Sequence, residues 1–305
     1  MKTISPITLN DTNVTTNVPE TDYPEWAIGT TYAVGYTVQI SSEHGTWENQ
    51  VADNIGNDPM TTDDRVSDDP KWLYLGKTNP WKMFDDVFVN DQTQTADEIV
   101  VQIVPGDVVD GLGVFEVDGQ SVTAVVTDPI DGEVYNNTKS LLDIEVEDFY
   151  EYFFSPVRSI RSAVFLDLPP YPDATIKVRI TDTGGTAKGG AVVAGTSIDI
   201  GKLRWGPSIG RISNSKRNKD DYGRVTLVPR KGARRIDLDL IIKNDSVVYS
   251  EYQLGLLDGI GAAFIGDDKD IGFEFLNIYG FFNDFRVVVP GLKISECAIE
   301  IEGFI

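Results

Sequence analysis

Hydrophobic and polar residues alternate along most of the chain, which is the pattern of β-strands with one buried face. Runs of β-branched residues are separated by turn-forming sequences such as PGD, DPIDG and TDTGG, as in hairpins and β-sandwiches. Strands are predicted at 98–104, 113–119, 121–127, 175–181, 191–201, 224–230, 234–243, 261–267, 271–282, 284–290 and 293–304. In 245–260, apolar residues instead recur near helical spacing (Val248, Tyr252, Leu256 and Leu257). The pattern therefore predicts a mainly β protein with one short helix.

The same pattern divides the chain into four segments. Residues 1–22 are rich in Thr, Asn and Asp and have no sustained period, which predicts an extended N-terminal arm that orders on contact with another surface. Residues 23–78 form a small aromatic β-module, with Trp and Tyr crowded among Gly, Asn and Asp. Residues 79–203 and 204–305 are predicted as two β-sandwich-like domains, the second with a basic stretch and the short helix.

The aromatic residues of 23–78 have two interpretations. Exposed indole and phenol rings stack on the C–H faces of sugars, while Asn, Asp and Gln side chains meet the hydroxyl groups. A module this short with almost no Leu or Ile also needs its aromatic rings for its own core, and Trp26, Tyr32 and Trp47 are candidates for that role. Both interpretations are open from the residues alone.

The spacing of these aromatic residues resembles a known family. The run from Trp26 to Val38, followed by Trp47-Glu48-Asn49, Pro59 and Trp72, is similar to the small chitin- and cellulose-binding modules of polysaccharide hydrolases and phage tail proteins. The resemblance spans 23–76. Two departures are Tyr36, where the family has an acidic residue, and the acidic loop 61–70, which disfavours acidic polysaccharides.

The resemblance implies a carbohydrate-binding site and candidate residues for it. Trp26 and Tyr32 match positions at which the family builds its core. The resemblance therefore assigns saccharide stacking to Trp47, Trp72 and Tyr74.

Composition narrows the classes of function. The 48 Asp and Glu residues exceed the 26 Lys and Arg residues, so the formal charge is −22. Such a chain repels phosphate backbones and anionic headgroups, and we expect no nucleic acid partner and no membrane insertion. The single cysteine and single histidine exclude intrachain disulfides, Cys/His zinc sites and iron–sulfur clusters. We expect no catalytic residues, no metal and no cofactor, and hence a protein that is not an enzyme.

The charge is unevenly distributed along the chain. Residues 202–235 hold 11 basic and two acidic residues, so this stretch carries +9 and the remainder −31. Such asymmetry predicts an assembly surface for an acidic protein, either another copy of the chain or a different subunit. Phosphate binding and a merely solvated loop are the alternatives. The candidate assembly residues are Arg211, Lys216, Arg217, Lys219, Arg230, Arg234 and Arg235.

A second resemblance concerns the later segments. Residues 200–230, the ending Ile301-Glu302-Gly303 and the junction 79–85 look like parts of structural proteins of tailed phages and prophages. This implies a homo-oligomeric component of a phage tail, tail tip or baseplate in the virion, made in the host cytoplasm. Its partners would be other virion tail proteins and host-surface polysaccharide.

Two other classes of function remain as hypotheses. One is a polysaccharide hydrolase, in which the module targets the substrate and carboxylates within 98–200 cut it. The other is a cell-surface adhesin, which the lack of a secretory signal pattern in the first residues disfavours.

Overall fold

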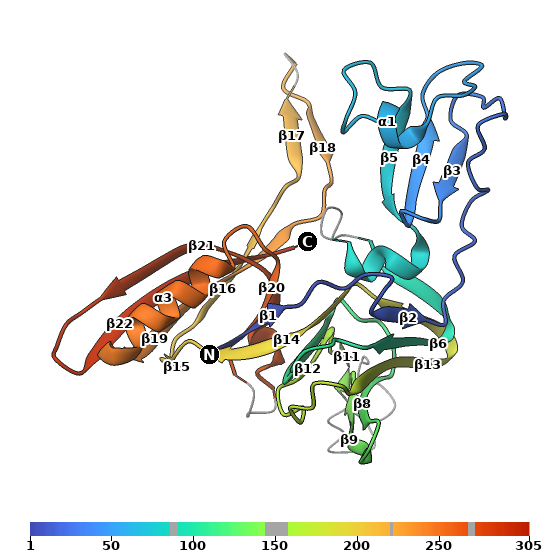
Figure 1. Ribbon diagram of the computed structural model, residues 1–305. Coiled ribbons are helices and arrows are strands. Elements are labelled where there is room, and N and C mark those ends of the chain that lie inside the picture. Colours follow the sequence, from blue (N-terminus) through green and yellow to red (C-terminus); the bar gives the residue numbers. More distant parts are fainter. Residues whose placement is uncertain (86–90, 144–157, 220–221, 268–271, 305) are drawn as a thin grey trace, which may run out of the picture.

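The computed structural model describes residues 1–85, 91–143, 158–219, 222–267 and 272–304. This part of the chain is mainly β, and its strands pair antiparallel (Figure 1). The longest helix within these residues is α3 (Val247–Leu256), inside the segment predicted to be helical. The predicted fold class is therefore confirmed. No helix in the described residues is long and apolar enough to cross a membrane.

The aromatic module is a three-stranded sheet that projects from the body of the molecule (Figure 1). Its strands are β3 (Thr37–Ile40), β4 (Gly45–Asn49) and β5 (Trp72–Lys77). A single helical turn, α1 (Pro59–Thr62), is capped by the Asp58 side chain, which accepts a hydrogen bond from the Met60 amide. The 3₁₀ helix η1 (Asn79–Phe84) joins the module to the body and buries Met83 in the neighbouring core.

The centre of the molecule is a β-sandwich. Alternating apolar residues of its two sheets pack together, as Ile99 and Val101 do with Val114 and Val192. One sheet has the order β2-β6-β13-β8-β9. The strands of this sheet are β2 (Val14–Thr16), β6 (Thr93–Ile103), β13 (Thr175–Gly189), β8 (Ser121–Asp128) and β9 (Gly132–Ser140). The short strands β10 (Leu142–Asp143) and β11 (Arg158–Ser159) pair separately.

The second sheet is ten-stranded and has the order β12-β7-β14-β1-β20-β21-β22-β19-β15, with β16 also paired to β19. Helix α3 packs Leu254 and Leu257 into the core of its C-terminal half. In place of the predicted strands 271–282 and 284–290, the structure has one strand, β21, which begins at Asn277 after a 3₁₀ turn at Glu274–Leu276 and has an irregularity between Phe282 and Asp284. The strands are β12 (Ser162–Phe165), β7 (Gly111–Phe115), β14 (Ala191–Asp199), β1 (Lys2–Pro6), β20 (Ala262–Ile265), β21 (Asn277–Val288), β22 (Ile294–Gly303), β19 (Ala233–Lys243), β15 (Lys202–Leu203) and β16 (Ser208–Ile212).

The predicted N-terminal arm is wrong. Strand β1 lies inside the ten-stranded sheet, between β14 and β20, and Ile4 is fully buried. The polar Thr3 is buried as well, because its hydroxyl donates a hydrogen bond to the Ala263 carbonyl at 3.0 Å. A strand of five residues has too short a pattern to be recognised, and its partners are distant in sequence.

The predicted division at 203/204 also differs from the structure. Strands from both predicted domains belong to the same sheet, and β1 joins the two halves. Continuous backbone hydrogen bonding across this junction makes the two segments one structural unit rather than two independent sandwiches.

Candidate functional site

The three aromatic residues predicted to stack on saccharide are buried. Trp47, Trp72 and Tyr74 are 1%, 0% and 6% exposed and form the core of the aromatic module. The Trp72 indole N–H donates to the Asn57 carbonyl at 3.0 Å, which satisfies its polar atom inside the module. The prediction that these rings face a sugar is therefore wrong. With so few aliphatic residues, the module uses its largest aromatic rings for its core.

An ion pair covers one side of this aromatic core. The Asp63 carboxylate accepts a hydrogen bond from the Trp47 indole at 3.0 Å and lies 2.6 Å from Arg65 Nη2. Burial tends to raise the pKa of Asp63, but the hydrogen bonds from Trp47 and Arg65 outweigh burial and hold this pKa below its ordinary value. The Arg65 guanidinium also lies 3.5 Å from the ring centroid of Tyr74. Burial, with a smaller contribution from the nearby Asp85 charge, raises the pKa of Tyr74 to about 12.

Two other tyrosines of the module are accessible to a ligand. Tyr23 and Tyr36 are each 44% exposed. Tyr23 lines a pocket of about 380 Å³ at the junction with the body, beside Asn79 and Gln94. The Asn79 side chain is oriented by two hydrogen bonds with the Gln94 backbone. The resemblance to carbohydrate-binding modules did not point to Tyr23, because a family pattern aligns positions along the chain, whereas the exposure of a side chain depends on the folded module.

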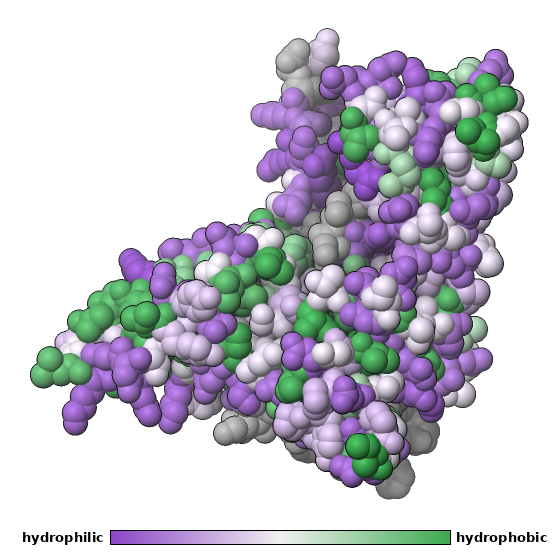
Figure 2. Space-filling model, viewed as in Figure 1, coloured by the Kyte–Doolittle hydropathy of each residue, from purple (hydrophilic) through white to green (hydrophobic). Residues whose placement is uncertain are grey.

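The basic stretch forms a hairpin that extends away from the body (Figures 1 and 2). Its strands, β17 (Lys216–Lys219) and β18 (Val225–Val228), pair with each other, and all of their residues are exposed. At its base, Asn214 and Ser215 bond across to the backbone of Lys231 and Arg230. We call residues 213–232 the basic hairpin; six of its residues are basic and two are acidic.

The structure brings together only part of the predicted assembly residues. Lys216, Arg217, Lys219 and Arg230 belong to the basic hairpin, and Arg211 is exposed on β16 at its base. Arg234 and Arg235 lie in β19 instead. Arg234 donates a hydrogen bond to the Phe275 carbonyl, and Arg235 bonds to Asp237 at 3.0 Å and Glu300 at 2.7 Å. These two guanidinium groups are bound within the body, so their assignment to a free assembly surface is corrected.

Helix α3 presents an apolar outer face that the sequence did not predict. Of the residues that recur at helical spacing, Leu257 is buried together with Leu254, whereas Val248, Tyr252 and Leu256 are exposed by 75%, 60% and 52%. The segment is apolar on both sides, a composition typical of a helix covered on both sides. Hydrophobic residues gather over this region in Figure 2. We call Val248, Tyr249, Tyr252 and Leu256, with Val289 and Leu292 of the adjoining turn, the helix face.

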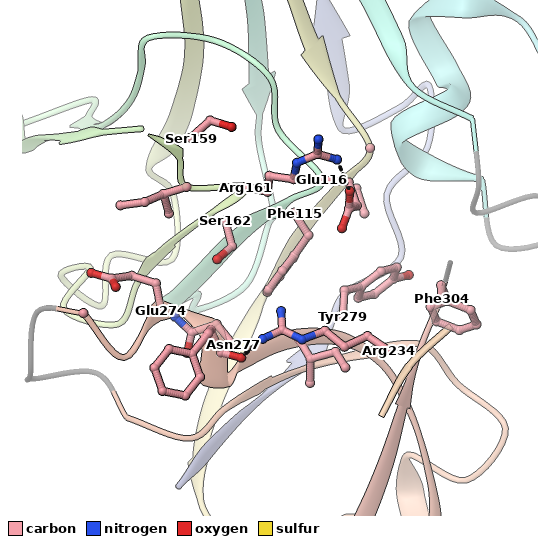
Figure 3. Close-up of a pocket in the computed structure, with 16 residues that line it drawn as sticks. Phe115, Glu116, Ser159, Arg161, Ser162, Arg234, Glu274, Asn277, Tyr279 and Phe304 are labelled. Atoms are coloured by element: carbon pink, nitrogen blue, oxygen red, sulfur yellow. Dashed lines mark hydrogen bonds and ion pairs between the residues drawn. The ribbon is translucent and has the colours of Figure 1, made fainter. Parts of the chain in front are cut away.

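A pocket of about 390 Å³ lies between the sandwich and the C-terminal strands (Figure 3). Phe115 and Tyr279 form one wall with ring centroids 5.9 Å apart, and the ring of Phe304 lies 5.1 Å from that of Tyr279. In the described part of the chain, no donor reaches the buried Oδ1 of Asn277 in its lining. This arrangement offers an aromatic wall and one free acceptor.

The pocket also bears on the hydrolase hypothesis, which needs two carboxylates in 98–200. Glu116 lies in this range but forms an ion pair with Arg161, at 3.5 Å. The other carboxylate of the lining, Glu274, comes from outside the range and lies on the opposite side of the pocket in Figure 3.

Comparison of the chain with models of known protein families and with curated proteins gave no match. The function is therefore inferred from the residues of the basic hairpin, the helix face and the module.

Proposed function

We propose that the chain is a structural component of a tailed-phage tail, tail tip or baseplate, and that it assembles through the basic hairpin with further copies and with other tail proteins. The observation that carries this proposal is a two-stranded ribbon whose strands are exposed along their whole length. A two-stranded ribbon is only marginally stable alone in water. Contact with a neighbouring protein surface would bury the exposed side chains of the ribbon and stabilise it.

The residues of the basic hairpin suit such a contact. Val225 and Leu227 of β18 are 48% and 63% exposed, beside the paired strand β17, which carries Lys216, Arg217 and Lys219. The chain outside 202–235 carries −31, so acidic surfaces are abundant on every copy. Opposite charge speeds association and selects the partner, while the apolar residues add affinity on burial.

The assignment to a phage tail is supported by the resemblance of 200–230 and the junction 79–85 to tail structural proteins. The proposal includes recognition of host-surface polysaccharide by the aromatic module, now through the exposed rings of Tyr23 and Tyr36. Copies repeated around a symmetric tail would turn weak stacking into firm attachment.

Labelling of purified particles tests the structural role. The chain is tagged in the genome that encodes it, and particles are examined by immunogold electron microscopy. We expect label at a fixed position on the tail, and loss of label when Arg217→Glu and Lys219→Glu are introduced together. Particles that carry tails but no label, while the tagged chain remains in the lysate, would rule out a virion role.

Glycan arrays with the full chain test the recognition role separately. We expect retention of at least one polysaccharide and its loss in Tyr23→Ala with Tyr36→Ala. Trp205→Ala, at an exposed aromatic residue outside the module, is the control and should bind normally. Equal binding by all three proteins would place any saccharide site elsewhere.

A further inference from the structure

We propose that the basic hairpin of one copy docks on the helix face of a neighbouring copy. This inference rests on the proposed function, because it names the surface that receives the hairpin in the assembly. Both surfaces expose apolar side chains next to charge, and each is left uncovered in the single chain.

Charge complementarity favours this pairing. The segment 244–260, which contains α3, has three acidic residues, Asp245, Glu251 and Asp258, and no basic residue. Glu251 and Asp258 are exposed. The basic hairpin carries six basic residues against two acidic ones. Lys243 and Lys293 flank the start of the helix, so opposite charges meet where the hairpin lies along its later part, beside Glu251 and Asp258.

Apolar complementarity points to the same contact. Val225 and Leu227 are two positions apart on β18 and so project from one face of the ribbon. The helix face offers Val248, Tyr252 and Leu256, and its tyrosines are residues that suit interfaces. The hydrogen bonds of Asn244 to the carbonyls of Gly291 and Lys293 hold the adjoining turn beside the start of the helix and extend the apolar patch.

The positions of the two surfaces make the contact intermolecular. The hairpin leads directly into the first residue of β19, Ala233. Helix α3 starts shortly after the last residue of the same strand, Lys243. Ten residue steps along a strand span about 33 Å. The hairpin moreover extends away from the sheet that α3 covers (Figure 1). A contact between two different surfaces is head-to-tail, and repeated around an axis it builds a ring.

Complementary charge reversals in the full chain test this contact. The hairpin variant carries Arg217→Glu and Lys219→Glu, and the helix variant carries Glu251→Lys and Asp258→Lys; all four side chains are exposed. Sedimentation velocity is expected to show self-association of the wild type and at least about tenfold weaker association of each variant alone, because the net charge of the hairpin falls from +4 to zero in one and that of 244–260 changes from −3 to +1 in the other. An equimolar mixture of the two variants should associate again, since the unchanged basic hairpin meets the unchanged acidic helix and the introduced glutamates meet the introduced lysines.

The control variant carries Lys177→Glu and Arg179→Glu on β13, the same change of net charge as in the hairpin variant, and should associate as the wild type does. A monomeric wild type, or a mixture that fails to associate, would overturn the pairing. Loss of the hairpin variant from particles together with normal incorporation of the helix variant would show that the hairpin docks on another tail protein. That result would leave the proposed function standing and reject this inference.

Discussion

At the scale of single residues, the aromatic module shows why residue type alone did not identify a binding site. Trp47 and Trp72 have the chemistry of sugar-stacking residues, yet both indole N–H groups are bonded inside the module, to Asp63 and to the Asn57 carbonyl. The two indoles are the largest side chains of the module's buried core. Their role is therefore stability.

Truncation of Trp72 should unfold the module rather than remove a ligand contact. Trp72→Ala is expected to lower the free energy of unfolding of the module by about 3–5 kcal/mol, the usual cost of removing a buried aromatic ring. Urea titrations followed by near-ultraviolet circular dichroism would measure this. Trp205→Ala, at an 83% exposed position, should change stability by less than about 0.5 kcal/mol. An unchanged Trp72→Ala protein would contradict the burial of this ring.

Asp63 makes the stability of the module depend on pH. Its pKa is lower in the folded chain than the ordinary 3.8, so its contribution is complete above pH 3.8 and is lost as the pH falls through the lower folded value. Asp63→Asn should lower the free energy of unfolding by about 2 kcal/mol near neutral pH, because the hydrogen bonds that the carboxylate accepts from Trp47 and Arg65 are weakened.

The comparison of Asp63→Asn with wild type at several pH values checks this prediction. The difference in urea midpoint should shrink as the pH falls below 3.8. Asp68→Asn, in the exposed part of the same loop, is the control and should leave the midpoint unchanged. A difference that is constant down to strongly acidic pH would show that the Asp63 charge is not the cause.

At the scale of elements, β1 decides the architecture. It connects the sandwich half of the large sheet, through β14, to the C-terminal half, through β20. Gly195 of β14 pairs with Pro6, and a Cβ atom there would collide with the Ser5 carbonyl. The absence of a side chain at residue 195 lets the two strands approach.

A side chain at this position should separate the halves of the sheet. Gly195→Val is expected to lower the free energy of unfolding by about 3 kcal/mol or more, because the obstacle is backbone rather than a movable side chain. Hydrogen exchange should show faster exchange of the amides of β1. Gly210→Val, at an open position in β16, is the matched control. Equal protection of β1 in both variants would contradict the close packing.

At the scale of the whole molecule, the uneven charge distribution has a measurable consequence. If the hairpin with its basic side chains meets an acidic surface, self-association should weaken strongly with salt, since the screening length falls from about 10 Å at 0.1 M to about 3 Å at 1 M. Sedimentation at the two salt concentrations should show a rise of at least about tenfold in the dissociation constant. Association that is equally tight at both would mean that apolar burial alone holds the copies together.

The sequence by itself determined what depends on neighbours along the chain. Alternation of apolar residues identified most of the long strands, such as β6, β13 and β22, helical spacing located α3, and the count of Lys and Arg located the hairpin that carries most of the predicted basic residues. Each of these features follows from local side-chain periodicity or from composition.

Only the tertiary structure decided which faces are covered. It placed β1 inside a sheet, put Trp47 and Trp72 in a core, turned Val248 and Tyr252 outward, and bound Arg234 and Arg235 within the body. These outcomes depend on partners far away in sequence, such as Lys2 with Asp199 or Arg235 with Glu300. Burial is a property of the packed chain, and a periodic pattern shows that a face is apolar without showing what covers it.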